Sequence, residues 1–404
     1  MEPNYANWVE WLFSRFPAYQ NLGAQAYKPG LERVITLLET LHIEQNKIPS
    51  IHIAGTNGKG STAAYCASLL QEKGLRVGLF TSPHIFDFSE RIRVNGEPIS
   101  QAHVIAFCKR YQALKLETDA SFFELTFAMA LDYFIKKKCD YIVIETGLGG
   151  RLDATNIIEP KVSIITNIAF DHQAFLGDTL QQIATEKAGI IKANTPVVIG
   201  EKNEFTQSVF IQKSTAVSAP IYFATDVELN IETIPVDGYQ KKNLQTALLA
   251  LKKLDFEFNE KQIKSALQHL KQHTGFFGRL QVIAEEPKIV IDVSHNSAGI
   301  NATLPLIIKQ VKRRLFILYG ASQDKDAAEI LSLFPPKAIV AACVFSNPRS
   351  KTIQDWQALG IKTIYADLAL AIQDIQKQMG IDDLLWITGS FFLLSDLPDQ
   401  KKIF

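Results

Sequence analysis

The chain has 404 residues, 47% of them hydrophobic, and its 42 lysines and arginines balance 42 aspartates and glutamates. This length well exceeds the roughly 100–150 residues of a typical domain, so we expect two domains. The zero net charge excludes the basic excess of proteins that coat nucleic acid or membrane surfaces, and no apolar run approaches the ~20 residues of a membrane span. We therefore expect small-molecule partners, without nucleic acid or membrane.

The N-terminal segment and the cysteines favour a cytoplasmic protein. The segment MEPNYANWVEWLFSRF is amphipathic and lacks the charged start, apolar stretch and cleavage site of a signal peptide. No heptad repeat or edge segment stands out, so we expect a monomer. The cysteines are scattered singly, as expected of core residues in a reducing compartment, at Cys66, Cys108, Cys139 and Cys343.

Short runs rich in valine and isoleucine alternate with helical periodicity in the first part of the chain. This alternation predicts an α/β domain in which helices cover both faces of a mostly parallel sheet. The predicted strands are Ile51–Ala54, Val77–Thr81, Tyr141–Glu145, Val162–Thr166 and Pro196–Gly200, and helices between them include Thr62–Gln71 and Phe122–Ile135.

A glycine-containing segment, Thr274–Gly278, follows two predicted helices at Asn243–Leu254 and Glu260–His273. Its glycines are typical of a linker, so we expect domains at residues 1–276 and 277–404. The second, smaller α/β domain has predicted strands at Ile289–Asp292, Leu315–Tyr319, Ala338–Phe345 and Leu384–Thr388 and predicted helices at Ala298–Val311, Ala327–Leu333 and Leu368–Met379.

Residues 51–62 combine a strand, a glycine-rich turn and a helix start, which predicts a phosphate-binding loop. The common pattern G-x-x-x-x-G-K-[ST] is not met, because Ile53 replaces its first glycine and Gly60 separates Lys59 from Ser61. We still expect Lys59 to reach the terminal phosphates of a nucleotide and Ser61 to bind Mg²⁺. The predicted nucleotide-binding residues here are Gly55, Thr56, Asn57, Gly58, Lys59, Gly60, Ser61 and Thr62.

The loop variant A-G-T-N-G-K-G-S-T resembles that of the folylpolyglutamate synthase and dihydrofolate synthase family, within the Mur-ligase superfamily. The resemblance continues in the family's order over nearly the whole chain. It implies an ATP- and Mg²⁺-dependent amide-forming ligase with a P-loop N-terminal domain and a Rossmann-like C-terminal domain. The matching segments are Thr81–His84, Glu90–Gly96, Glu145–Asn156, Thr166–His172, Phe175–Thr179, Glu186–Lys192 and Asp292–Asn296, with weaker matches at Gly278–Leu280 and Asp324–Asp326.

The implied reaction joins L-glutamate to dihydropteroate or to a (tetrahydro)folate. ATP phosphorylates the pterin-side carboxylate, and the glutamate amine then attacks the acyl phosphate. Two anions must meet, so cations are needed to offset their repulsion. Glu145 ends an apolar strand, where a carboxylate faces the crevice of a parallel sheet and can bind metal. By resemblance, Glu145 and Ser61 hold the nucleotide's Mg²⁺, and His172 and Ser82 belong to a second metal site.

Further roles rest on the resemblance. Lys187 has the pattern of a solvated helix lysine, yet its counterpart in the family is often carbamylated. Asn243 and Arg279 are candidate contacts to the adenine side and the phosphates of ATP, while Asp292 and His295 would orient the amine or contact the nucleotide. The predicted catalytic residues are Lys59, Glu145, His172, Lys187, Asp292 and His295, and Asp292 is also counted among the nucleotide-binding residues.

Two further features concern the start of a helix in the second domain and the folate site. Ser297 stands where the family more often has proline, and we expect this serine to cap the following helix instead. The segment Tyr19–Lys28 resembles the family's N-terminal lead-in to the folate site. Four aromatic residues could stack on a pterin, although we expect most of them in the core: Phe86, Phe88, Phe122 and Phe123.

Two other functions compete with this interpretation. A peptidoglycan Mur ligase usually carries an additional N-terminal domain, and only about fifty residues precede the phosphate loop, which leaves no room for one. A non-catalytic nucleotide-binding protein would have lost functional side chains, whereas Lys59, Glu145, His172 and Lys187 are all present. The sequence leaves the acceptor and the glutamate chain length open.

Overall fold

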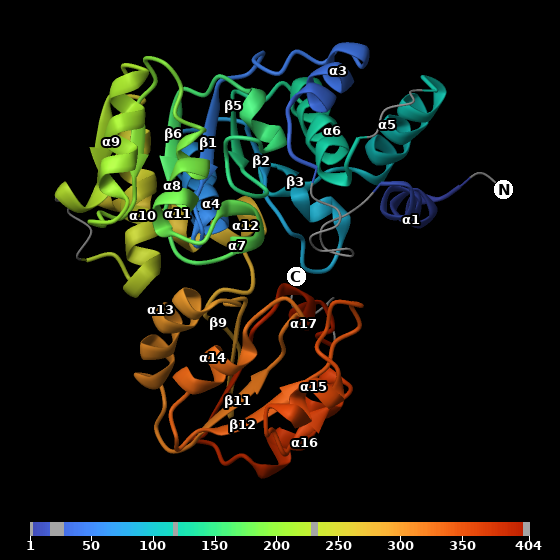
Figure 1. Cartoon of the computed structure of the whole chain (residues 1–404), viewed down its shortest axis with the longest axis vertical. Coiled ribbons are helices and arrows are strands. Elements are labelled where there is room, and N and C mark those ends of the chain that lie inside the picture. Colours follow the sequence, from blue (N-terminus) through green and yellow to red (C-terminus); the bar gives the residue numbers. More distant parts are fainter. Residues whose placement is uncertain (1–2, 17–27, 116–119, 228–232, 399–404) are drawn as a thin grey trace. The chain divides into compact units, whose positions relative to one another are not determined.

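The computed structural model describes residues 3–16, 28–115, 120–227 and 233–398. The chain divides into two compact units, unit 1 at residues 1–276 and unit 2 at residues 277–404. Each unit contains a sheet with helices packed on it (Figure 1). Among the described residues, no helix has both the length and the apolar character needed to cross a membrane.

In the described part of unit 1, the strands form a sheet in the order β4-β3-β2-β5-β1-β6-β7-β8. The six strands from β2 to β8 in this order pair in parallel, and β3 and β4 add an antiparallel edge. The strands are β1 (Ser50–Ala54), β2 (Val77–Phe80), β3 (Ile92–Val94), β4 (Glu97–Pro98), β5 (Tyr141–Glu145), β6 (Val162–Ile165), β7 (Val197–Ile199) and β8 (Ile221–Phe223).

Helices follow most strands of this sheet, because a parallel connection needs a crossover. Several begin at a side-chain cap, such as Ser121 before α6 and Thr179 before α8. The α-helices are α1 (Tyr5–Arg15), α3 (Glu32–Thr40), α4 (Lys59–Gln71), α5 (Gln101–Ala113), α6 (Phe122–Lys136), α7 (Gln173–Leu176), α8 (Leu180–Ala188), α9 (Gln207–Ala216), α10 (Gly238–Lys252), α11 (Glu260–Gln268) and α12 (Leu270–Thr274), with 3₁₀ turns η2 (Phe88–Arg91), η3 (Ala154–Ile157) and η4 (Ala224–Asp226).

Unit 2 has a second sheet, whose described strands follow the order β13-β12-β11-β14-β10-β9. All pairs are parallel except β9 with β10. The elements are β9 (Gln281–Glu285), β10 (Lys288–Asp292), α13 (Ser297–Ile308), β11 (Leu315–Tyr319), α14 (Ala327–Leu333), β12 (Ile339–Cys343), α15 (Ile353–Ala358), β13 (Ile364–Tyr365), α16 (Leu368–Gln378), β14 (Leu384–Thr388) and α17 (Phe391–Ser395).

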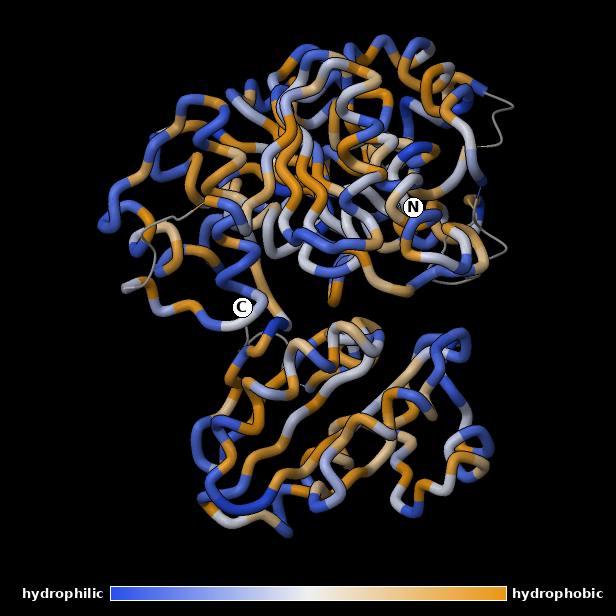
Figure 2. Tube along the Cα trace, turned by 60° about the vertical axis from the view of Figure 1, so that its left-hand side comes forward, coloured by the Kyte–Doolittle hydropathy of each residue, from blue (hydrophilic) through white to orange (hydrophobic). Residues whose placement is uncertain are grey.

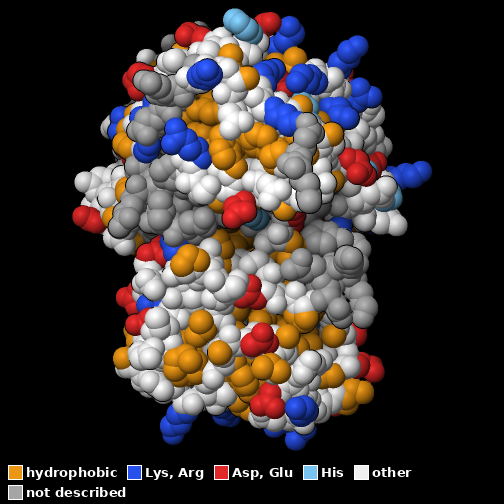
Figure 3. All heavy atoms as spheres, turned by 90° about the vertical axis from the view of Figure 1, so that its right-hand side faces the viewer, with side chains coloured by type: hydrophobic (Ala, Val, Ile, Leu, Met, Phe, Trp, Pro, Cys, Tyr) orange, Lys and Arg blue, Asp and Glu red, His pale blue; other side chains and the backbone are white. Residues whose placement is uncertain are grey.

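The central strands of both sheets are buried along their length, including all five residues of β1, β11 and β14. Figure 2 shows the hydrophobic colour running along the middle of the larger unit. On the face in Figure 3, hydrophobic side chains of unit 2 lie in several patches between isolated charged groups. Scattered apolar surface of this kind is ordinary for a folded domain.

The two-domain α/β architecture expected from the sequence is confirmed, and the strand–helix alternation is found in both units. One expected helix, Glu260–His273, is wrong as a continuous element, because it breaks at His269 into α11 and α12. The antiparallel strands β3, β4 and β9 were not expected, since they are short or lie at sheet edges.

Candidate active site

The carboxyl ends of four neighbouring parallel strands, β2, β5, β1 and β6, carry most of the candidate residues of unit 1. β1 runs into the phosphate loop, β5 ends at Glu145, β6 is followed by Thr166, and Ser82 comes shortly after β2. Ile53 of β1 is paired with Glu145 of β5, so Glu145 lies at the same end of the sheet as the start of the phosphate loop. Ligands of open α/β sheets bind at this edge.

The phosphate loop turns sharply into α4 at two glycines with positive φ. Gly55 has a φ of 152°, and Gly58, which precedes the first residue of α4, has a φ of 82° in the left-handed region. A side chain at Gly58 would also overlap Asn243 Oδ1. Lys59 Nζ donates to the carbonyl oxygens of Gly55 and Thr56, each at 3.2 Å. The lysine therefore lies folded over the loop where phosphates would bind.

The segment that follows β6 holds the phosphate loop in place through hydrogen bonds. Asn167 accepts twice, from Thr56 N at its carbonyl oxygen (2.9 Å) and from Asn57 N at its side-chain Oδ1 (2.8 Å). Thr166 Oγ1 donates to Asn57 O at 2.6 Å, and Thr56 Oγ1 exchanges hydrogen bonds with the backbone of Ala169. The backbone N–H groups of Thr56 and Asn57 are therefore hydrogen-bonded within the protein. The backbone N–H groups in the first turn of α4 are the ones that can bind an anion.

Asn243, expected near the adenine, lies on α10 directly against Gly58. Its residue is 8% exposed, and its Nδ2 donates to Gln240 Oε1 at 3.3 Å. Gln240 Oε1 also accepts from the Tyr65 hydroxyl of α4 at 3.1 Å. The structure therefore places Asn243 in a polar group under the phosphate loop.

Glu145 is buried, at 4% exposed, beside two other polar groups of the same strand edge. Ser82 N donates to Glu145 Oε2 at 3.1 Å. Arg91 is buried as well, and burial lowers the pKa of its guanidinium to about 10 although the charges of Glu90 and Glu145 act to raise it. Ser61 is buried in the first turn of α4. A serine hydroxyl and a carboxylate are the oxygen ligands that Mg²⁺ and Mn²⁺ prefer, so these residues fit a divalent ion.

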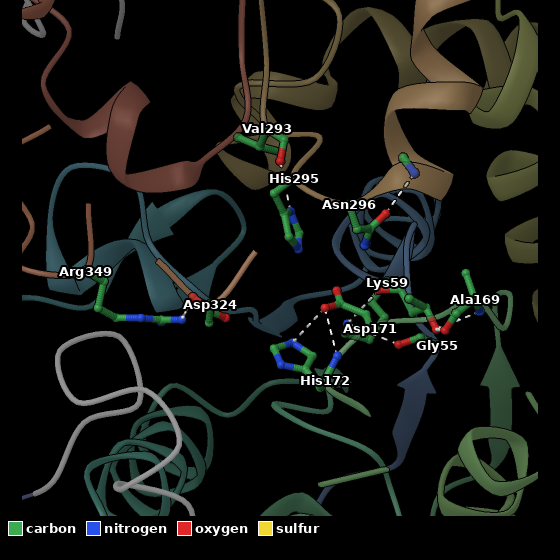
Figure 4. Close-up of polar contacts among 12 residues, drawn as sticks. Gly55, Lys59, Ala169, Asp171, His172, Val293, His295, Asn296, Asp324 and Arg349 are labelled. Atoms are coloured by element: carbon green, nitrogen blue, oxygen red, sulfur yellow. Dashed lines mark hydrogen bonds and ion pairs between the residues drawn. The ribbon is translucent and has the colours of Figure 1, made fainter. Parts of the chain in front are cut away.

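His172 and Asp171 lie beside Lys59 and Gly55 (Figure 4). His172 has a left-handed backbone, with a φ of 52°, and its N–H donates to Asp171 Oδ1 at 2.9 Å. Its Nε2 lies 3.9 Å from the same carboxylate oxygen, and its side chain is 26% exposed. A positive φ is uncommon outside glycine and marks a conformation held by the surrounding contacts.

Lys187, on α8, points into the phosphate loop and not into solvent. The residue is 3% exposed, and its Nζ donates to Gly55 O at 2.9 Å, the carbonyl that Lys59 also contacts. Burial, aided by the positive charge of Lys59, lowers the pKa of Lys187 to about 7, against the opposing charges of Asp171 and Asp153. A large share of this amine is therefore neutral at physiological pH.

The loop between β5 and η3 positions the helix that carries Lys187. Arg151 N donates to Glu186 O at 2.7 Å, and the Arg151 guanidinium pairs with the Glu186 carboxylate at 2.9 Å. Asp153 is buried and accepts from Leu148 N at 2.8 Å, which fixes the turn from within. A side chain at Gly150 would press on the backbone carbonyl of Lys187. The glycines of this motif thus allow the loop to lie flat on α8.

In unit 2, Asp292 is the last residue of β10, and His295 lies in the loop that follows. The Asp292 carboxylate accepts from the backbone N–H groups of Leu280 (2.9 Å) and Ser294 (2.8 Å), so it ties two loops together. His295 Nδ1 lies 3.0 Å from Val293 O (Figure 4). Because a carbonyl only accepts, Nδ1 is the donor in this contact.

Helix α13 begins differently from the expectation. Asn296 is its N-cap and accepts from Gly299 N at 2.8 Å, whereas Ser297 is the first helical residue. The expected capping role of Ser297 is therefore wrong, because the preceding asparagine already supplies the better placed acceptor. Arg279 donates to Phe277 O at 2.9 Å and lies over the ring of Phe391.

The weak motif Asp324–Asp326 has structural contacts of its own. The Asp324 carboxylate pairs with Arg349 at 2.6 Å (Figure 4), and Asp326 caps α14 by accepting from Glu329 N at 3.0 Å. The Asp324–Arg349 pair connects the loop after β11 to the loop after β12. The motif is thus a loop-to-loop contact in unit 2.

Of the four candidate stacking aromatics, expected mostly in the core, Phe88 and Phe122 belong to the buried core of unit 1. Phe123 packs against that core and lies over Gly147, while Phe86 is half-buried. Most of the segment Tyr19–Lys28 falls outside the described residues. Residue patterns do not identify Asn167 or Asp153 as site residues, because their only mark in the sequence is that they lie within the matched motifs.

Comparison with known proteins gives a consistent set of relatives. The family models for the "Mur ligase middle domain" and the "Mur ligase, glutamate ligase domain" match residues 53–243 and 278–391. The dihydrofolate synthase/folylpolyglutamate synthase of Bacillus subtilis (strain 168) is 32% identical, over 96% of this chain and 100% of its own.

Two solved structures resemble the chain over nearly its full length. One is the bifunctional folylpolyglutamate synthase/dihydrofolate synthase of Yersinia pestis complexed with AMPPNP and Mn ion, with a TM-score of 0.85 and 28% identity, covering 98% of this chain and 97% of that one. The other is Escherichia coli FolC in complex with DHPP and ADP, with a TM-score of 0.85 and 27% identity, covering 98% and 96%.

Proposed function

The chain belongs to the folylpolyglutamate synthase/dihydrofolate synthase family, and from this membership we propose that it accepts both dihydropteroate and reduced folates. It is an ATP-dependent ligase that adds L-glutamate in folate metabolism. The phosphate loop carries the ATP-dependent part of the proposal, because its braced backbone, cationic side chains and nearby carboxylate suit transfer of a phosphoryl group. The dual choice of acceptor rests on the relatives named for both activities. A reaction that uses ATP also fits the cytoplasmic location expected from the sequence.

The phosphate loop binds the nucleotide through the first turn of α4. Lys59 leaves the carbonyl oxygens of Gly55 and Thr56 and turns to the terminal phosphates, which are stronger acceptors. Thr56 and Asn57 act through the backbone by keeping the loop on Asn167. The nucleotide's metal ion is held by Ser61 and Glu145, where it supplies charge neutralisation for the transferred phosphoryl group.

His172 and Ser82 are proposed to serve the second metal position, as the sequence predicts. Ser82 is already tied to Glu145 through its backbone amide, which keeps its hydroxyl at the same strand edge. The left-handed backbone of His172 and its contact with Asp171 set the direction of the imidazole. Both residues therefore have a fixed place beside the phosphate loop.

Lys187 is proposed to be carbamylated in the active enzyme. Only a neutral amine attacks CO₂, and the pKa of Lys187 near 7 makes that form abundant. Attack of the neutral amine on CO₂ forms the N–C bond and releases one proton, so a neutral side chain becomes an anion, which would support cations beside the phosphate loop. The tight packing of the 146–156 loop on α8 keeps this side chain directed at Gly55.

In unit 2, the proposed roles are orientation of the glutamate amine and contact with the nucleotide. His295 presents its Nε2 edge, because Nδ1 is hydrogen-bonded to Val293 O. Asp292 acts by fixing the loop from which His295 extends. Arg279 follows the linker and presents a cation for the phosphates of ATP. We also propose that the enzyme works as a monomer.

The proposal is tested by phosphate release from Mg-ATP in the presence of glutamate, with dihydropteroate, tetrahydrofolate or no acceptor. Products are identified by mass spectrometry. A mass gain of one glutamate with dihydropteroate establishes dihydrofolate synthase activity, and a gain with tetrahydrofolate establishes folylpolyglutamate synthase activity. Gain with one acceptor alone would refute the dual specificity, and no gain with either would refute the proposed substrates.

A further inference from the structure

A second group of ligand-type side chains lies in unit 1, at the end of α4 opposite the phosphate loop. Glu72 is the C-cap of α4, His269 stands between α11 and α12, and His273 is in the last turn of α12. One ligand atom from each of the three lies within 4.8 Å of the other two. In the described part of the chain, this is the group of histidine and acidic residues that meets the distances of a metal site.

The separations suit a transition-metal ion. His269 Nδ1 lies 3.6 Å from Glu72 Oε1. Two ligands about 2.1 Å from one Zn²⁺ ion at a tetrahedral angle are about 3.4 Å apart, so this pair needs little movement. The rings of His269 and His273 are 5.4 Å apart between centroids and are separated by four positions, which places them on one side of the chain.

The hydrogen bonds around His273 already fix the tautomer that a metal requires. Ser68 Oγ donates to Ala266 O at 2.7 Å, so its single hydrogen is used. Towards His273 Nδ1, at 2.9 Å, the hydroxyl can therefore only accept. Nδ1 carries the proton and Nε2 keeps its lone pair for a ligand. Such an outer hydrogen bond to the remote ring nitrogen is what orients histidine ligands in zinc sites.

The electrostatic setting also favours a cation. A carboxylate at the C-terminus of a helix faces the negative end of the helix dipole, which is an unfavourable place for Glu72. Ser265 Oγ donates to Glu72 Oε1 at 3.0 Å and lies 3.4 Å from His269 Nδ1. Its single hydrogen is used on Glu72, so Nδ1 carries a proton in this contact, and that proton must leave Nδ1 when an ion binds there.

We propose that Glu72, His269 and His273 form a Zn²⁺ site distinct from the nucleotide's metal site. Its ligands are two imidazoles and one carboxylate, a set that suits Zn²⁺ and not Mg²⁺. The His269 side chain is 43% exposed, so an ion can enter and water completes the coordination. The ion connects α4, which begins at the phosphate loop, to α12, which ends at Thr274 just before the linker between the two units.

The test uses the untagged full-length protein after treatment with EDTA. Zn²⁺ binding is measured by calorimetry, and Co²⁺ is added as a spectroscopic probe of tetrahedral coordination. We expect one equivalent of Zn²⁺ to bind, with a visible Co²⁺ band. His273→Ala and Glu72→Gln should each weaken binding at least about tenfold, since even the loss of a group that hydrogen-bonds to a metal ligand does so. Ser68→Ala should weaken it as well.

His42→Asn is the matched control, because His42 is exposed and its left-handed backbone suits asparagine. This variant should bind Zn²⁺ like the wild type. Circular dichroism without metal checks that each variant is folded, and hydrogen exchange should show that Zn²⁺ protects α11 and α12. Unchanged Zn²⁺ affinity in both His273→Ala and Glu72→Gln, or no saturable binding by the wild type, would overturn the proposal.

Discussion

Gly58→Ala is the sharpest test of how the phosphate loop is built. The residue has a φ of 82°, a conformation that costs a side chain about 1–2 kcal/mol. The new methyl group would also overlap Asn243 Oδ1, and such overpacking costs about 1–3 kcal/mol. We expect unit 1 to lose about 2–5 kcal/mol of stability. The affinity for a non-hydrolysable ATP analogue should fall together with stability.

The two contributions separate in a double-mutant cycle. Asn243→Ala removes the overlapping oxygen, so it should relieve about 1–3 kcal/mol of the cost of Gly58→Ala and leave the backbone cost in place. Amide hydrogen exchange in α4 is the suitable measurement, because it reports the opening of unit 1 separately from unit 2. If the effects of the two substitutions add to within about 0.5 kcal/mol, the steric account of this glycine is refuted.

Three further changes follow from the contacts of unit 1. Carbamylation of Lys187, followed by ¹³C NMR with labelled bicarbonate, should be strong near pH 8 and fade as the pH drops through about 7, because protonation removes the reactive amine. Asn167→Ala removes the acceptor of the Asn57 amide and should weaken nucleotide binding by about 1–3 kcal/mol in calorimetry. Asp132→Asn should destabilise unit 1 by about 1–3 kcal/mol without changing nucleotide affinity. Burial alone would raise the pKa of Asp132, but hydrogen bonds from His103, Lys136 and Arg110 lower it, so its stabilisation is present above about pH 4 and lost as the pH falls.

The controls for these changes keep the shape and alter one property. Lys187→Arg should give no carbamate signal at any pH, and a signal in that variant would place the modification elsewhere. Asn167→Asp keeps the accepting oxygen and should bind nucleotide better than Asn167→Ala. A melting temperature for Asp132→Asn equal to the wild type at neutral pH would show that the buried ion pairs contribute nothing net.

In the unmodified protein, Lys187 also affects the pH dependence of folding. Its pKa is about 7 in the folded state and near 10.4 in an unfolded chain, so the unfolded chain binds more protons between these values. Stability should therefore rise with pH in this window. The burial of Lys187 opposes folding most at lower pH, where the amine must be charged.

The sequence predicted the regular parts of both units because burial leaves a strong pattern there. Central strands such as β1 and β11 are continuous apolar runs, and their bounds agree with the expected ones to within a residue. The strand β3 is buried but has only three residues, and the edge strand β9 has no fully buried residue, so neither gives a long apolar run. The break at His269 was missed because the apolar periodicity continues through it from α11 to α12.

The candidate site was predictable as a set of residue types but not as a set of contacts. The loop glycines and Lys59 can be recognised locally, whereas Asn167 braces Asn57 from a position 110 residues away. Lys187 is the clearest case, because helical periodicity alone suggests a solvated lysine. Only the packing of the 146–156 loop on α8 shows that its amine is enclosed against Gly55.

The sheet order explains why these distant residues form one site. β1 lies between β5 and β6, so the phosphate loop has the end of β5, with Glu145, on one side and the segment after β6, with Asn167, on the other. The glycines at 147 and 150 then let the loop after β5 lie close to Phe123 and to α8. That contact directs Lys187 back to the carbonyl of Gly55. The phosphate loop is therefore held through its backbone from both sides, which leaves the Lys59 side chain to respond to the nucleotide.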